Sequence, residues 1–141
     1  MSQFKLAVAP SGLVSSLSLH MSWDSGVTDG GSGDMSMGVA WSDNAYSAAD
    51  FAAHGTFTNS SLPGNTACRA PGVIQSIPLH EMAMEVAAET ADIQPDILRR
   101  LNFYQKGERA LRGVVIGERG YNWNLPAMWD AARTRWEVDK R

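Results

Sequence analysis

The sequence predicts an α+β fold: an N-terminal β-hairpin and short strands, followed by two or three amphipathic helices. The hairpin is predicted by two runs, residues 4–8 and 17–21, in which apolar and polar residues alternate on either side of a Pro10-Ser11-Gly12 turn. The helices are predicted by apolar residues that recur at spacings of three, four and seven between about residue 73 and residue 136.

Length and composition indicate one folded unit. The chain has 141 residues, 44% of them hydrophobic and 19% charged, which suits a single domain with one core. We divide it into a hairpin (1–22), a loop rich in glycine, serine and aspartate (23–34), a helix, a strand and a loop (35–72) and a helical part (73–141). Within the third segment, residues 52–58 are the predicted strand.

Charge and cysteine usage exclude several classes of protein. The net charge is −3 and the basic residues are scattered, so we expect no nucleic-acid partner. No apolar run approaches the roughly 20 residues that span a bilayer, and the N-terminus lacks a signal-peptide core. We therefore expect a cytoplasmic protein without membrane contact. One cysteine allows no internal disulfide and no iron–sulfur cluster of its own, and the histidines His20, His54 and His80 lack zinc-ligand spacing.

The best helix is predicted over residues 73–89. We expect Glu81, Glu85 and Glu89, which recur every four residues, to form a solvated stripe. A second helix is expected to open at Gln94-Pro95-Asp96, a short strand over residues 114–116, and a last helix at Asn124-Leu125-Pro126. The residues expected to form the buried sides of these helices are Ile74, Ile77, Met82, Val86 and Ala87 in the first, Ile97, Leu98 and Leu101 in the second, and Trp129, Ala132 and Trp136 in the last.

Several segments, in the same order, resemble the molybdenum hydroxylases, the family of xanthine dehydrogenases and aldehyde oxidases. Residues 59–69 (NSSLPGNTACR) are similar to the family stretch TNLPSNTAFRG. Residues 42–46 (SDNAY) resemble MDNxY, residues 93–104 (IQPDILRRLNFY) resemble LSPEEVRxxNLY, and residues 124–130 (NLPAMWD) resemble TLPxxWD. The resemblance covers nearly the whole chain and implies a fragment of the molybdenum-cofactor-binding domain.

The resemblance also implies a part of a cofactor site. The family's arginine in NTAFRG lies at the molybdenum centre, and its counterpart is Arg69. Ala67 and Cys68 would line the same wall of the molybdopterin pocket, and Cys68 replaces the usual phenylalanine without being a metal ligand. Amide hydrogens and a cation suit an anionic oxo-metal dithiolene and its phosphate.

Two departures from the family pattern bear on the substrate. Pro71 stands where the family has a phenylalanine that stacks on an aromatic substrate, and a proline has no π-face. Met37 stands where xanthine-oxidising members have an arginine, and its thioether cannot stabilise charge on a purine. The resemblance therefore implies aldehyde or heteroaromatic substrates ahead of xanthine.

The resemblance implies an enzyme fragment that is inactive alone. The family hydroxylates carbon with oxygen from water, and its base glutamate lies in a GxGE segment that this sequence lacks; we assign no catalytic residue. Iron–sulfur clusters and FAD would be carried by the missing parts of the enzyme, which are the expected partners, and the full enzyme is expected to be a homodimer. Two alternatives stay open: a degenerate, non-catalytic module for protein–protein interaction, and a truncated gene model.

Overall fold

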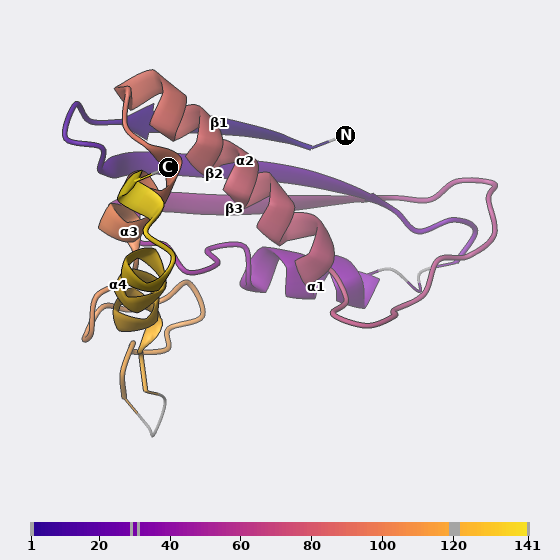
Figure 1. Ribbon diagram of the computed structural model, residues 1–141. Coiled ribbons are helices and arrows are strands. Elements are labelled where there is room, and N and C mark those ends of the chain that lie inside the picture. Colours follow the sequence, from indigo (N-terminus) through magenta and orange to yellow (C-terminus); the bar gives the residue numbers. More distant parts are fainter. Residues whose placement is uncertain (1, 29, 31, 119–121, 141) are drawn as a thin grey trace.

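A three-stranded sheet with helices packed on one face forms the centre of the computed structural model (Figure 1). The structure describes residues 2–28, 30, 32–118 and 122–140. Its elements, in chain order, are β1 (Gln3–Val8), β2 (Val14–Asp24), α1 (Ser32–Ala40), β3 (Asp50–Thr58), α2 (Val73–Ala91), α3 (Pro95–Asn102), α4 (Leu125–Arg135) and a 3-10 turn η2 (Val138–Lys140). The α+β prediction is confirmed, and the N-terminal hairpin is present.

The sheet has the order β1-β2-β3 and combines both kinds of pairing. β1 and β2 are antiparallel, as a hairpin requires, whereas β2 and β3 are parallel and are connected through α1. Parallel neighbours need such a crossover. The loop predicted over residues 23–34 is shorter than expected, because β2 continues to Asp24 and α1 already begins at Ser32.

The core lies between the sheet and α2. Buried and more exposed residues alternate along β2, so one face of the strand is buried. Its residues belong to the same core as residues of α2 and α3 and the aromatic residues Tyr46 and Phe103. The central members of this core are Leu17, Leu19, Met21, Leu79, Ala83, Met84, Ala87, Leu98, Tyr46 and Phe103. The opposite face of β2 carries Ser16, Ser18, His20 and Ser22.

The predicted buried side of α2 is wrong for most of its residues. Ala87 is buried, but Ile74, Met82 and Val86 are 64%, 60% and 42% exposed. The buried side consists of Ser76, Leu79, His80, Ala83, Met84, Ala87 and Ala88. The error has a physical cause: α2 has apolar residues on both sides, and periodicity alone cannot choose between two apolar stripes.

Two further predictions of local structure need correction. Residues 114–116 form no strand; they make one isolated bridge, Val115 to Arg109, with backbone hydrogen bonds on either side of it. Gly113 and Gly117 flank this segment with positive φ, which turns the chain too soon for a strand to form. On α3, Leu98 is buried as predicted, but Ile97 and Leu101 are 47% and 42% exposed.

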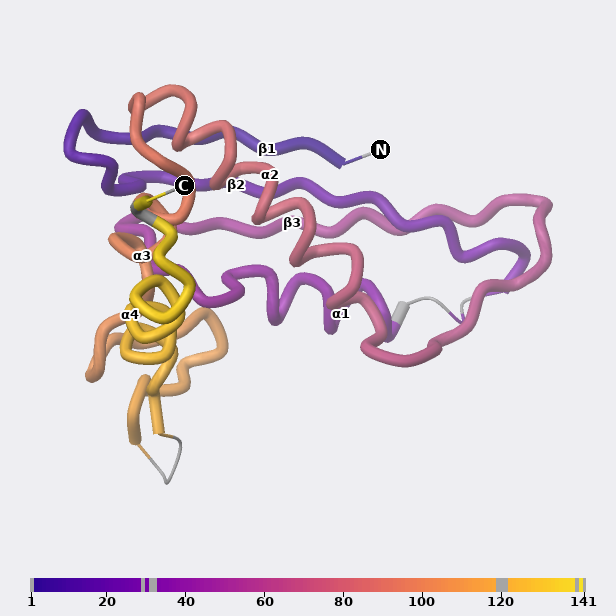
Figure 2. Tube along the Cα trace, in the orientation of Figure 1, coloured from indigo at the N-terminus to yellow at the C-terminus, as the bar shows by residue number. Residues whose placement is uncertain are grey.

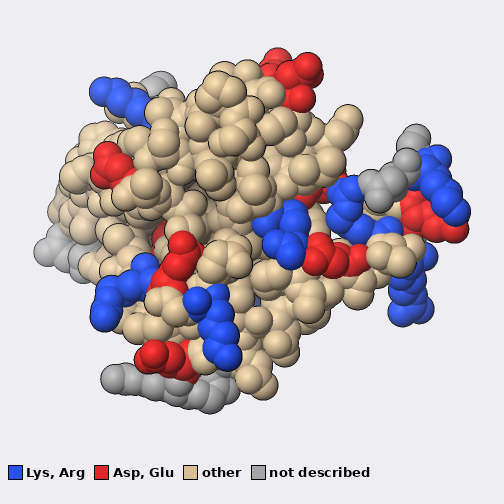
Figure 3. Space-filling view, turned by 90° about the vertical axis from the view of Figure 1, so that its left-hand side faces the viewer, with Lys and Arg blue, Asp and Glu red and all other residues tan. Residues whose placement is uncertain are grey.

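The C-terminal helices form a separate corner of the molecule (Figure 1). Arg100 of α3 holds Asp130 of α4 through two hydrogen bonds of 2.8 and 2.9 Å, and Arg133 pairs with Asp96. Trp129 packs edge-on against Phe103, with ring centroids 5.2 Å apart. Figure 3 shows that basic and acidic side chains lie next to one another at this end, as these ion pairs require. The predicted buried side of α4 is wrong for Trp136, which is 59% exposed, and Trp129 and Ala132 are only half-buried, because α4 packs at the end of the molecule and not in the core.

Candidate functional site

The loops that follow β2 and β3 run side by side beyond the end of the sheet (Figure 2). Because the two strands are parallel, their carboxyl ends share one edge, the usual place for ligands in parallel sheets. The Asn65 side chain strengthens the pairing by donating to the carbonyl of Asp24 at 2.8 Å. Three backbone bonds join the loops, from the amides of Val27, Ser60 and Asn65 to the carbonyls of Leu62, Gly26 and Ser25, at 3.0, 3.0 and 2.9 Å.

Two glycines allow this close approach. Gly26 has φ +70°, and a Cβ there would lie 2.2 Å from the carbonyl oxygen of Pro63. A Cβ on Gly64 would lie 2.3 Å from the hydroxyl of Thr28. Contacts that close leave no room for a side chain at either glycine, so Gly26 meets the backbone of Pro63, Gly64 meets the side chain of Thr28, and the loop over residues 59–65 is held against the loop that follows β2.

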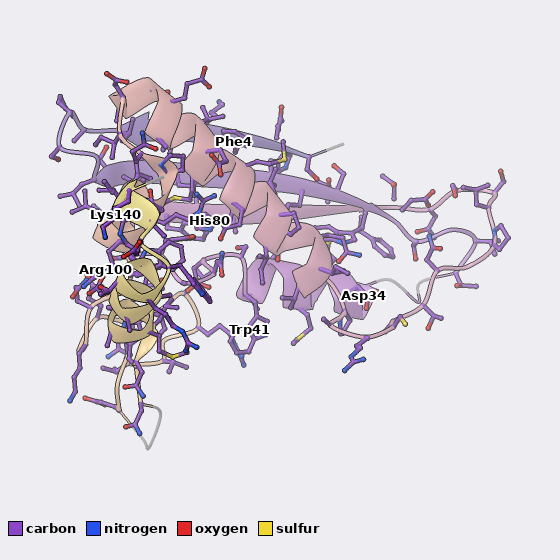
Figure 4. All side chains as sticks on the ribbon, in the orientation of Figure 1. Phe4, Asp34, Trp41, His80, Arg100 and Lys140 are labelled. Carbon is purple, nitrogen blue, oxygen red and sulfur yellow. The ribbon has the colours of Figure 1, made fainter. Side chains whose placement is uncertain are left out.

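A second backbone contact brings α1 and α2 together at the same edge. Gly72, directly before α2, has φ +70°, and a Cβ there would lie 1.8 Å from the carbonyl oxygen of Asp34 and 2.5 Å from the amide nitrogen of Gly38. Gly38 in turn packs on the ring of Trp23. The N-termini of both helices therefore meet beside the loop over residues 65–72 (Figure 1), and Figure 4 places Asp34 at this end of α1.

The predicted cofactor residues Ala67, Cys68 and Arg69 all lie on this loop and are exposed. Cys68 is a free thiol. Within the described part of the chain, the amides of residues 66–70 donate to no backbone carbonyl. Residues 59–72 contain one cation, Arg69, and no acidic residue. Exposed amides, an arginine and two adjacent helix N-termini together favour an anionic ligand.

The predicted substrate residues Met37 and Pro71 come from separate motifs, yet they flank one contact. Met37 precedes Gly38, Pro71 precedes Gly72, and these glycines are in van der Waals contact. Met37 is 39% exposed and Pro71 is half-buried. A groove of ≈ 510 Å³ lies between α1 and β3, bordered by Leu111 and Arg112.

The segment 42–46, noted in the sequence only for its resemblance to MDNxY, is held by buried hydrogen bonds. Asp43 accepts from the Tyr104 hydroxyl and from the amide of Leu111, both at 2.9 Å. The Nδ1 atom of His80 lies 2.7 Å from the carbonyl oxygen of Ser42. Figure 4 shows His80 between α2 and the sheet. Sequence reasoning gave these residues no role, although the motif itself was the available signal.

Burial shifts the ionisation of the groups in this network. Desolvation and then the neighbouring Glu81 raise the pKa of Tyr46, and desolvation and then Asp43 raise the pKa of Tyr104. Both phenols therefore stay protonated and act as donors at neutral pH. Desolvation lowers the pKa of His80 below its ordinary value of 6.5, so its ring is neutral and its Nδ1 donates to the carbonyl of Ser42.

Fold and edge together define a piece of an α+β domain with an exposed loop, rich in free amides, beside the ends of two parallel strands. The chain belongs to the molybdopterin cofactor-binding domain family, whose model matches residues 1–103. This membership confirms the resemblance and favours the enzyme fragment over a non-catalytic module.

Relatives and solved structures agree with this assignment. The chain is 30% identical over 105 residues to aldehyde oxidase 4 of Cavia porcellus and 29% identical over 99 residues to a nicotinate hydroxylase of Emericella nidulans. The aldehyde oxidoreductase of Desulfovibrio desulfuricans superposes with a TM-score of 0.84 at 24% identity, and the quinoline 2-oxidoreductase of Pseudomonas putida with 0.77 at 15% identity. Both structural matches cover 99% of this chain.

The chain spans only a small part of these proteins. It aligns over 74% and 70% of its own length with the two curated relatives, but over 8% and 7% of theirs. It covers 15% and 19% of the two solved chains. Within the described residues, no helix is both long and apolar enough to cross a membrane.

Proposed function

We propose that the chain forms one wall of the molybdenum–molybdopterin site of an oxidoreductase that hydroxylates aldehydes or N-heterocycles. The observation that carries the proposal is the exposed loop containing Ala67, Cys68 and Arg69, which is braced against the carboxyl ends of β2 and β3. When bound, the cofactor would supply the oxygen-transfer and redox chemistry. The chain's own contribution is to hold it.

The residues of the loop fit this group. A molybdopterin carries negative charge on its phosphate and on its metal–dithiolene end, and residues 59–72 offer amide hydrogens and the Arg69 guanidinium and contain no acidic residue of their own. The buried indole N–H of Trp23, beneath Gly38, has no hydrogen-bond partner among the described residues. Since buried donors are normally satisfied, an acceptor from the rest of the enzyme or from the cofactor is expected there.

The substrate class is inferred from Met37 and Pro71. Their positions beside the Gly38–Gly72 contact support the view that both border the same space next to the cofactor loop. Neither side chain supplies a charge or a flat π-face. A purine would lack its stabilising arginine, so aldehydes or simple N-heterocycles are the better substrates.

The partners are the remaining domains of the same enzyme, which would hold the iron–sulfur clusters and FAD. The apolar stripe of α2 that faces outward, Ile74, Met82 and Val86, supports this inference. A helix that is apolar on both sides is normally buried on both sides. We also propose that the assembled enzyme is cytoplasmic, where the exposed thiol of Cys68 would stay reduced, and homodimeric.

A graft tests the proposal. The chain would replace the matching segment of a molybdenum aldehyde oxidoreductase, and bound molybdenum and pterin would be measured, with the iron–sulfur absorbance as a folding control. We expect the chimera to retain molybdenum and Arg69→Ala to lose most of it, because the anion loses its cation. The control Arg109→Ala, outside the loop, should retain it. A folded chimera that binds cofactor equally well with Arg69→Ala would contradict the assigned role.

A further inference from the structure

His20 and His54 are brought side by side on the sheet. They are register partners in the parallel pair β2–β3 and lie 34 residues apart in sequence. Their ring centroids are 6.1 Å apart and the rings meet edge to face at 74°. Nothing in their sequence spacing indicates this pairing, because it depends on the register of two strands that the α1 crossover separates.

Both imidazoles lie on the face of the sheet that the helices leave uncovered. His20 alternates with the buried Leu19 and Met21, which face the core, so it points to the other side. The neighbouring pair on that face, Ser22 and Thr56, joins its hydroxyls at 2.9 Å. His54 is exposed and His20 is half-buried. Neither ring has a hydrogen bond to another described residue.

We propose that His20 and His54 together bind one divalent transition-metal ion, with Cu²⁺ preferred over Ni²⁺ and Zn²⁺. Neutral imidazole is a ligand for all three ions, and copper binds most strongly in the Irving–Williams order. The distance permits it. Each ring nitrogen lies about 1.2 Å from its centroid, so rings whose centroids are 6.1 Å apart can bring one nitrogen each to within about 4 Å once both turn an edge toward the same ion, which bonds of about 2.1 Å allow. The edge-to-face arrangement therefore has to change by rotation of at least one ring, and the exposed His54 side chain is free of core packing.

The site differs from a structural metal centre. Across the described part of the chain, no group of three or more His, Cys, Asp or Glu residues is arranged to hold a metal. The pair therefore supplies two ligands and leaves the other positions to water or an added ligand, which makes the bound ion exchangeable. It is also separate from the cofactor edge: each histidine lies four residues before the end of its strand, about 13 Å away along the sheet.

The test is a titration of the untagged chain with Cu²⁺, followed by calorimetry and electron paramagnetic resonance. We expect one ion per chain and nitrogen hyperfine coupling from two imidazoles. His20→Asn and His54→Asn should each weaken binding by about tenfold or more, because chelation by two ligands is lost, and the double variant should abolish it. The titrations use chain whose Cys68 thiol is alkylated, so that it neither binds nor reduces the ion, and Ser18→Ala, on the same face of β2, should bind as the parent does.

Two outcomes would overturn the proposal: the parent chain shows no saturable Cu²⁺ binding, or the double variant binds with unchanged affinity and hyperfine pattern. Circular dichroism would check the fold of every variant. Should His20→Asn unfold, His54→Gln decides the question alone, because His54 is exposed and carries no packing role in the core. Since the pair lies outside the cofactor loop, the Arg69→Ala result and the copper result can fail independently.

Discussion

Glu81 of α2 and Arg99 of α3 form a hydrogen-bonded ion pair, with 2.8 Å between Oε2 and Nε. The other carboxylate oxygen of Glu81 accepts from the Asn44 amide at 2.7 Å and from the Tyr46 hydroxyl at 2.9 Å. One side chain thus joins α2, α3 and the segment 42–46. The prediction that the glutamates of α2 form a solvated stripe is therefore wrong for Glu81, which has three side-chain partners. The four-residue spacing of the glutamates gives no information about these partners.

Removing the charge of Glu81 should destabilise the chain. Glu81→Gln keeps the size of the side chain but cannot satisfy Arg99 and both neutral donors at once, so we expect a loss of about 2–4 kcal/mol in the free energy of unfolding. Urea denaturation would measure it. Glu89→Gln, an exposed change on the same helix, is the control and should stay within about 0.5 kcal/mol of the parent. Equal midpoints for the two variants would refute the assigned role.

A side chain at Gly72 should separate α1 from α2. Gly72→Ala would place a Cβ 1.8 Å from the carbonyl oxygen of Asp34, at a backbone φ of +70°. Because both atoms belong to backbone, we expect a loss of more than about 2 kcal/mol. Gly33→Ala is the matched control, because nothing lies within 4 Å of the Cβ position at Gly33 in α1. This variant should be neutral or slightly stabilising. Thermal unfolding of both variants checks this, and a neutral Gly72→Ala would exclude the contact.

The buried ring of His80 should make stability depend on pH. Desolvation lowers its pKa in the folded chain below the ordinary value of 6.5, so the unfolded chain binds the proton first. Its contribution is complete above pH 6.5 and is lost as the pH falls from there toward the lower folded value. Urea midpoints between pH 8 and pH 5 would show the decline. His80→Gln should flatten it, whereas a slope unchanged in that variant would assign it to other groups.

The outward stripe of α2 should control self-association of the isolated chain. Replacing Ile74, Met82 and Val86 by glutamine should reduce binding of a hydrophobic dye and shift size-exclusion elution toward the monomer, because these side chains form exposed apolar surface. Stability should change by less than about 1 kcal/mol. Met84→Gln changes a core residue of α2 that is only 1% exposed, and it should instead destabilise the folded chain by several kcal/mol. Unchanged elution of the triple variant would argue against a docking surface.

Local signals predicted the elements well where one pattern dominated. Alternation in residues 4–8 and 17–21 gave the correct hairpin, and Pro95 marked the first position of α3. The candidate site was predicted through the motif over residues 59–69 and not through its geometry. What the motif could not indicate is that Gly72 packs on α1, since that contact joins two segments whose proximity depends on the β2–α1–β3 crossover.

The sequence by itself determined the order of strands and helices and the family of the chain, because periodicity, turn residues and ordered motifs are local properties. Only the tertiary structure decided which side of α2 meets the sheet, that Glu81 is shared by Arg99 and Tyr46, and that His20 faces His54. These three features depend on strand register and on which of two apolar surfaces packs into the core. Neither the register nor that choice can be read from a single short window of the sequence.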